Sequence, residues 1–153
     1  MTEQNKKILT TGSAVLLAVI MAYTFRIIGR GHFYPTLFSY MRSFIYIGLY
    51  TAWGLSIRRR IVQKQVGRYL VSISVLLILW FAFRTVKYFI LWQPDAIRYM
   101  WYFFYLPMLF VPMLALLIAM SLGKPDDYRL PGWSAIMWIV SGALLLLVLT
   151  NDL

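Results

Sequence analysis

Three basic side chains lie in or beside long apolar segments, where a charge is costly unless it has a partner. Arg42 and Arg84 each lie several residues inside a predicted helix, about 8 to 10 Å from its end at about 1.5 Å per residue. An arginine at that depth either extends to the membrane surface or points into the helix bundle toward a partner or water. Lys87 shares a helix face with Arg84, and the two would repel each other unless an anion or carboxylate lay between them. These cations could bind an anionic or amphipathic ligand, or they could serve only as anchors at the surface.

Aromatic residues gather at the same predicted ends of the helices. Tyr88 follows Lys87, and the run YMWYFFY extends from Tyr99 to Tyr105. Part of this enrichment is the ordinary aromatic belt of a membrane interface. Ring faces beside cations also offer cation-π and apolar contacts to a ligand. We therefore predict an outward-facing ligand pocket formed by Arg42, Arg84, Lys87, Tyr88, Trp101 and Tyr105.

The residue types that catalysis and metal binding require are scarce. The chain has no cysteine and a single histidine, His32, which excludes thiolate chemistry, the HExxH motif and multi-histidine metal clusters. The predicted spans contain no aspartate, glutamate or histidine to serve as an acid, a base or a metal ligand. Asp126 and Asp127 lie in a polar link between Lys124 and Arg129, which is typical of a solvated turn. We therefore expect no enzymatic activity, metal or cofactor in this chain.

The composition identifies lipid as the natural solvent. Hydrophobic residues make up 61% and charged residues 13%, and the mean hydropathy is +0.72, so a water-soluble chain of this length would expose too much apolar surface. Several segments approach or exceed the roughly 20 residues needed to cross a bilayer, and they lack the alternation of a barrel strand. We predict an all-α polytopic membrane bundle, a single domain over 1–153, with five transmembrane helices at about 8–28, 34–57, 69–92, 98–122 and 132–150.

A basic link sets the predicted orientation. A net charge of +10 would suggest nucleic acid in a soluble protein, but the densest basic run, RRRIVQKQVGR, lies between two predicted spans. Lysine and arginine in such links mark the cytoplasmic side and attract anionic lipid headgroups. We expect a multi-pass protein of the cell membrane with its N-terminus inside and its C-terminus outside, and no nucleic-acid partner. The residues assigned to topology and headgroup contact are Arg58, Arg59, Arg60, Lys64 and Arg68.

Two prolines interrupt the fourth predicted helix. Pro107 and Pro112 each remove a backbone hydrogen bond and bend a helix, a cost that neighbouring helices or waters absorb in a membrane. Pro112, Ala115 and Ala119 lie on one stripe, where another helix could approach closely. A static kink is as common as a moving hinge. We predict a hinge at Pro107 and Pro112, beside the ligand pocket.

The order of the last four predicted helices resembles a known family. The proline-bearing span FYLPMLFVPMLALLIAMSLGK is followed by a short polar link and then by SAIMWIVSGALLLLVLTNDL. This arrangement resembles the N-terminal seven-transmembrane sensor region of bacterial histidine kinases, whose closing span ends in a Thr-Asn-x-x-His signature. Thr150 and Asn151 match that signature, and its histidine would fall one position after Leu153. The likeness covers about 34–153 and leaves one extra helix ahead of it.

The resemblance implies a sensory input module of a two-component signal-transduction protein. It implies three more helices after Leu153 and a cytoplasmic output domain, so we expect a truncated chain, although a complete five-helix protein is physically acceptable. The module would sense an external or membrane-dissolved ligand and could form a homodimer. The alternative is a small transporter or permease subunit for an anionic or amphipathic solute. Transporters commonly contain internal repeats with matching broken helices, and this sequence shows no such repeat.

Overall fold

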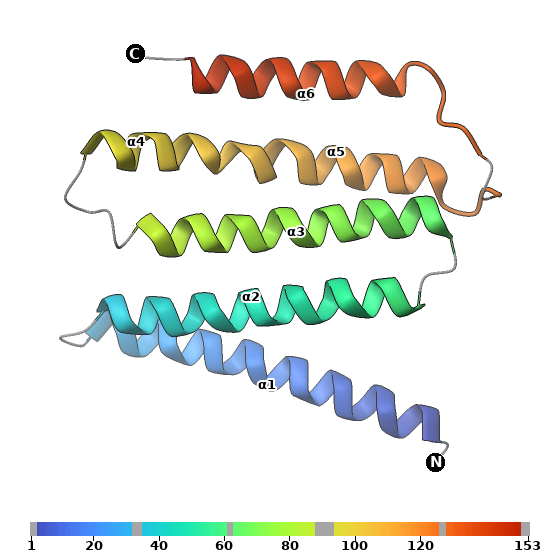
Figure 1. Ribbon diagram of the computed structural model, residues 1–153. Helices are drawn as coiled ribbons and strands as arrows, with labels where there is room; N and C mark the ends of the chain where they lie inside the picture. The colour runs from blue at the N-terminus through green and yellow to red at the C-terminus, as the bar shows by residue number, and fades with distance from the viewer. Residues whose placement is uncertain (1–2, 32–34, 61–62, 88–93, 126–127, 151–153) are drawn as a thin grey trace. The chain divides into compact units, whose positions relative to one another are not determined.

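The computed structural model describes residues 3–31, 35–60, 63–87, 94–125 and 128–150, and all regular structure within these ranges is helical. The helices follow one another along the chain as Figure 1 shows. They are α1 (Glu3–Gly31), α2 (Pro35–Arg60), α3 (Lys64–Lys87), α4 (Pro94–Phe103), α5 (Tyr105–Ser121) and α6 (Ser134–Leu149). The predicted all-helical fold is confirmed for these residues.

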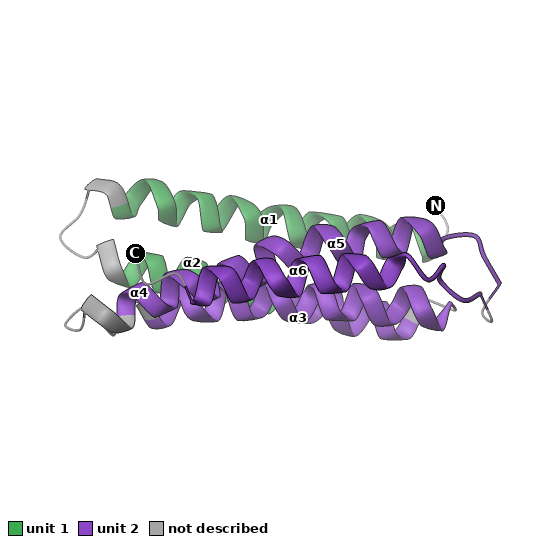
Figure 2. Cartoon of the chain, turned by 90° about the horizontal axis from the view of Figure 1, so that it is seen from above, with its two compact units in different colours: residues 1–49 green, residues 50–153 purple. Residues whose placement is uncertain are grey.

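The chain divides into two compact units (Figure 2). Unit 1, residues 1–49, contains α1 and the first part of α2. Within it, the ring centroids of Phe25 and Phe38 lie 6.0 Å apart, and a Cβ on Gly29 would lie 3.1 Å from the Cβ of Phe38. The end of α1 therefore packs closely against the start of α2. Unit 2, residues 50–153, contains the rest of α2 and helices α3 to α6.

Three helical segments are long and apolar enough to cross a membrane, namely Glu3–Gly29, Lys64–Val86 and Ile97–Ser121. Helix α6 is a shorter apolar helix of 16 residues. In each of the three segments, at most 22% of the most apolar stretch of 18 residues is buried within the protein. Large apolar side chains such as Ile139 and Leu147 are likewise mostly exposed. This extent of exposed apolar surface is compatible with a membrane location.

Several hydroxyl groups within the helices are satisfied by the backbone of their own helix. The side-chain oxygens of Thr24, Ser72, Thr85 and Ser121 each donate to the carbonyl four residues earlier, at 2.7 to 3.0 Å. Among the described residues, no buried side-chain nitrogen or oxygen lacks a hydrogen-bond partner. A hydroxyl paired in this way needs no water, which suits a helix surrounded by lipid.

The fourth predicted helix consists of two helices, α4 and α5. The hydrogen-bond pattern changes at Phe104, whose N–H donates to the carbonyl of Trp101 at 3.1 Å, a three-residue spacing. Pro107, in the first turn of α5, has no N–H to offer the carbonyl of Phe103 four residues earlier. Pro112 lies inside α5 without ending it. The structure places the break beside Pro107 and none at Pro112, and movement at either proline stays a prediction.

The core of unit 2 lies between α3 and α5. Its buried centre consists of Ile73 from α3 and Met113, Leu114 and Leu117 from α5. Helix α6 packs against α5 and contributes Met137 to the edge of this core. Helices α3, α5 and α6 run side by side, each antiparallel to its neighbour (Figure 1). The start of α3, the end of α5 and the start of α6 therefore lie at the same end of unit 2.

A glycine lets the last part of α2 pack directly on α3. The hydroxyl of Ser74, only 1% exposed, donates to the carbonyl of Tyr50 at 2.7 Å. A Cβ on Gly54 would lie 2.5 Å from the Oγ of Ser74, so a larger residue fits there only if one of the helices shifts. The rings of Tyr50 and Phe81 stack with their centroids 5.8 Å apart. These contacts position the basic end of α2 against α3.

We expect Gly54→Ala to lower the free energy of unfolding by about 1 to 3 kcal/mol, the usual cost of overpacking a close contact. Gly48→Ala is the matched control, because it lies in the same helix with nothing within 4 Å of its Cβ position. Thermal unfolding in detergent, followed by circular dichroism, compares the two variants. Adding Ser74→Ala to Gly54→Ala should restore part of the loss, because it removes the oxygen that the new Cβ meets. Equal unfolding midpoints for the two single variants would contradict the close approach of α2 to α3.

Candidate functional site

The residues of the predicted ligand pocket are divided between the two units. Arg42 of α2 belongs to unit 1, and Arg84 of α3 belongs to unit 2; both side chains are half-buried. Their convergence on one pocket therefore stays a prediction. The side chain of Lys87 and the whole of Tyr88 lie outside the described residues.

Trp101 and Tyr105 lie on opposite sides of the break between α4 and α5. Their side chains are 51% and 42% exposed, and neither lines the cavities described below. The neighbour of Arg84, Phe83, stacks its ring on Phe103 with the centroids 5.1 Å apart. This stack brings the region of α3 around Arg84 next to the end of α4. The structure thus places this part of the predicted pocket at the break in the helix.

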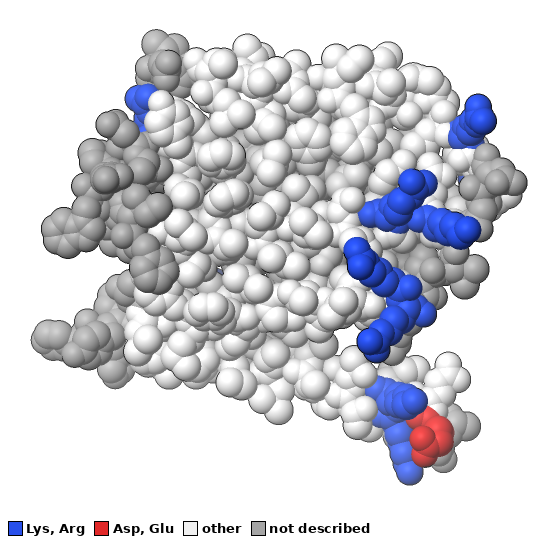
Figure 3. Space-filling model, viewed as in Figure 1, with Lys and Arg blue, Asp and Glu red and all other residues white. Residues whose placement is uncertain are grey.

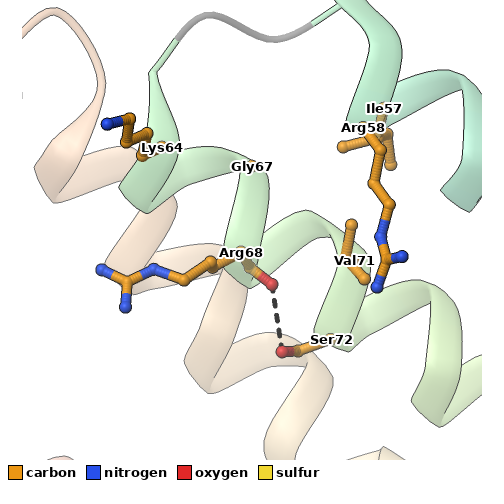
Figure 4. Close-up of a pocket in the computed structure, with 7 residues that line it drawn as sticks. All are labelled: Ile57, Arg58, Lys64, Gly67, Arg68, Val71 and Ser72. Carbon is orange, nitrogen blue, oxygen red and sulfur yellow. Dashed lines mark hydrogen bonds between the residues drawn. The ribbon is translucent and has the colours of Figure 1, made fainter.

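A basic cavity lies between the end of α2 and the first turns of α3 (Figure 4). Its volume is about 820 Å³. Arg58 of α2 and Lys64 and Arg68 of α3 supply its charge. Its other lining residues are Ile57, Gly67, Val71 and Ser72. Three of the residues predicted to contact lipid headgroups therefore line one cavity.

The other two residues of that predicted set lie elsewhere. Arg59 lines a neighbouring hollow on α2 together with Ala52, Leu55 and Ser56. The backbone of Arg60 ends α2, and its side chain lies outside the described part of the structure. The basic run is therefore divided between at least two faces of the helix hairpin.

The cations surround the basic cavity rather than converge on one point. Lys64 and Arg68 are one helical turn apart and extend from the same side of α3, whereas the guanidinium of Arg58 reaches alongside Val71 (Figure 4). The hydroxyl of Ser72 donates to the carbonyl of Arg68 at 3.0 Å, so its proton is directed to the backbone. Three separated charges suit a headgroup with several oxygens better than a single small ion.

The helices that form the cavity carry no carboxylate of their own. The sequence contains no acidic residue between Glu3 and Asp95, and the side chains of Arg58, Lys64 and Arg68 are all exposed. In the space-filling view, lysine and arginine gather at the end of unit 2 that carries the α2–α3 link, beside a broad uncharged surface (Figure 3). Clustered cations of this kind create a positive potential that attracts anions.

A glutamine connects the basic link to the far end of α5. The Nε2 of Gln63 donates to the carbonyls of Ser121 and Lys124 at 2.8 and 2.9 Å. The last carbonyls of a helix lack helical partners, so such a donor satisfies groups that would otherwise need water. Gly123, with a φ of 74°, adopts the left-handed conformation that commonly ends a helix. The α2–α3 and α5–α6 links therefore meet at one end of unit 2.

Sequence reasoning missed Gln63. Its partners are 58 and 61 residues away along the chain, and they are backbone carbonyls, which every residue type carries. The one available signal was Gly123, which marks the end of a helix but does not indicate what would bind its carbonyls.

We expect Gln63→Ala to lower the free energy of unfolding by about 1 to 3 kcal/mol, because two carbonyls at the end of α5 lose their donor. Gln65→Ala is the matched control, since the Gln65 amide contacts the Tyr69 hydroxyl of its own helix at 3.4 Å. Thermal unfolding in detergent measures both. If the two variants unfold at the same temperature, the contact between the links does not stabilise the protein.

Compared with known proteins, the chain matches no protein-family model, no curated protein and no solved structure. The resemblance to the sensor region of histidine kinases therefore stays a prediction. The basic cavity, the broken helix and the exposed apolar surface are the features from which a function can be argued.

Proposed function

We propose that this chain is a multi-pass membrane protein that serves as the input module of a signal-transduction protein such as a histidine kinase. In this proposal α1, α2, α3, the α4–α5 segment and α6 make five crossings, and the N-terminus is cytoplasmic. The exposed apolar surface of three long helices supports the membrane location. Helix α6 is about 24 Å long at about 1.5 Å per residue, somewhat less than the roughly 30 Å hydrocarbon core, a mismatch that local thinning of the bilayer accommodates.

The orientation is supported by the meeting of two links that both carry lysine and arginine. Gln63 of the α2–α3 link bonds the carbonyl of Lys124 in the α5–α6 link, so the cations of both links belong to one end of unit 2. Lysine and arginine in short links collect on the cytoplasmic side of a membrane. This argument depends on contacts within unit 2 alone, and it agrees with the orientation predicted from the charges.

The signalling part of the proposal depends on one observation, the break between α4 and α5. Helix α5 belongs to the core with α3, whereas α4 meets α3 at the stack of Phe83 on Phe103. A ligand that contacted Arg84, Trp101 or Tyr105 would bind close to the break and would favour one angle between α4 and α5. A change of that angle would reach α3 and α6 through α5, which touches both.

Single cysteines test the orientation directly, because the chain contains none of its own. A membrane-impermeant maleimide should label Arg98→Cys in intact cells, because α4 starts on the proposed outer side. It should label Arg59→Cys and Lys124→Cys only after the cells are permeabilised. Labelling of the last two in intact cells would overturn the proposed orientation, and labelling of Arg59→Cys alone would overturn the shared side of the two links.

Spin labels test whether Pro107 maintains the break. With labels at Tyr99→Cys and Leu116→Cys, Pro107→Ala should narrow the distance distribution and move it toward about 25 Å, the length of 17 residues of continuous helix at about 1.5 Å each. The reason is that alanine restores the N–H that can bond the carbonyl of Phe103. Double electron–electron resonance in nanodiscs gives the distribution.

Pro112→Ala is the matched control for this measurement. Helix α5 continues through Pro112, so its replacement should leave the distance distribution as it is in the parent protein. A parent distribution already as narrow as that of Pro107→Ala would mean that the junction is rigid, and the proposed joint would be wrong.

A further inference from the structure

A second cavity adjoins the basic one and is mainly apolar. It has a volume of about 510 Å³ and lies between α3, α5 and α6. It shares Arg68, Val71 and Ser72 with the basic cavity, so the two hollows have a common wall. The rest of the lining is Tyr69, Val75, Leu76, Leu106, Phe110, Leu114 and Trp138.

The residues that line this second cavity, a groove along the helices, form two facing stripes, one on α3 and one on α5. Arg68, Ser72 and Leu76 follow one another at four-residue intervals along α3, and Leu114 and Phe110 follow the antiparallel α5 in the same direction. The stripes extend from the charged mouth toward the middle of the helices, where Trp138 of α6 contacts Phe110 with the ring centroids 6.0 Å apart. The groove is thus charged at one end only.

We propose that the two cavities form one site for an anionic phospholipid. The headgroup lies between Arg58 on one side and Lys64 and Arg68 on the other, and one acyl chain lies in the groove along Val75 and Phe110. The charge of the mouth, supplied by three cations without an acidic lining residue, complements a phosphate. The apolar groove behind the mouth has the character that an acyl chain requires and that a nucleic acid or a free phosphate does not.

The cations and the groove have different roles in this site, because the site is surrounded by lipid. An acyl chain that moves from the bilayer into the groove leaves one apolar medium for another, so it gains little from the hydrophobic effect. The preference for this lipid must therefore come from the cations at the mouth, and the groove determines how the chain lies. Arg68 is the critical residue because, of the three residues that line both cavities, it alone carries a charge.

The bound lipid would connect helices that are otherwise joined by few polar contacts. Its headgroup would bridge the end of α2 and the start of α3, and its chain would fill the space between α3, α5 and α6. This inference rests on the membrane location proposed above. It does not depend on which side of the membrane the α2–α3 link faces.

Quenching of Trp138 by brominated lipid tests the proposal. The full chain is purified in detergent micelles with its five other tryptophans changed to phenylalanine, and phosphatidylglycerol or phosphatidylcholine with the same dibrominated chains is added. Half-maximal quenching should need about tenfold less phosphatidylglycerol than phosphatidylcholine. Arg68→Gln should remove this difference, whereas Arg129→Gln, an exposed cation outside both cavities, should keep it. Equal quenching by the two lipids in the parent chain would overturn the site.

Two further arms separate a lipid from a free anion. Inorganic phosphate at millimolar concentration should not relieve the quenching, and unbrominated phosphatidylglycerol should relieve it; equal relief by both would show that only the mouth binds.

Val75→Phe, which fills the groove, should weaken quenching several-fold, while Leu79→Phe, one turn further along α3 and outside the lining, should not. Equal effects of these two variants would overturn the placement of the acyl chain. Detergent micelles do not separate an inner from an outer compartment. The quenching result is therefore independent of the orientation that the maleimide experiment tests.

Discussion

The packing of α3 against α5 is the contact on which the rest of unit 2 depends. Ile73 and Leu117 lie at its centre, and α6 packs on the far side of α5. With α3 held in this way, the pair Gly54 and Ser74 positions the end of α2, and Gln63 joins the start of α3 to the end of α5. In the proposed membrane location, lipid would provide little hydrophobic force between helices, so close packing and a few hydrogen bonds would supply the cohesion.

The separation of charge from apolar surface links the proposed orientation to the proposed lipid site. Arg58, Lys64 and Arg68 line the mouth of a groove, and in the proposed topology the same cations, between two spans, would mark the cytoplasmic side. A headgroup attracted to that side would find the groove already adjacent. Membrane insertion and lipid binding would then be two consequences of one charge distribution.

The break between α4 and α5 shows that two prolines in neighbouring turns can affect a helix differently. Pro107 leaves the carbonyl of Phe103 without its usual donor, and the chain responds with a tighter turn at Phe104. Pro112 lies in the same helix as much of the buried core and does not end it. The helix therefore continues through Pro112, whose side chain is exposed, and is interrupted beside Pro107, whose side chain is buried.

Composition and segment length by themselves predicted that the chain is helical, where its main helices lie and where its positive charge gathers. Long apolar segments favour a lipid environment, where a helix satisfies every backbone polar group within one segment. Only the tertiary structure decided that Phe104 separates two helices, that Gln63 reaches the end of α5, and that a groove continues from Arg68 along Val75. The reason is that these helices are apolar on nearly every side. Hydrophobic periodicity marks the inner face of a helix in water, but in such helices it does not show which faces meet, and each of these features depends on that choice.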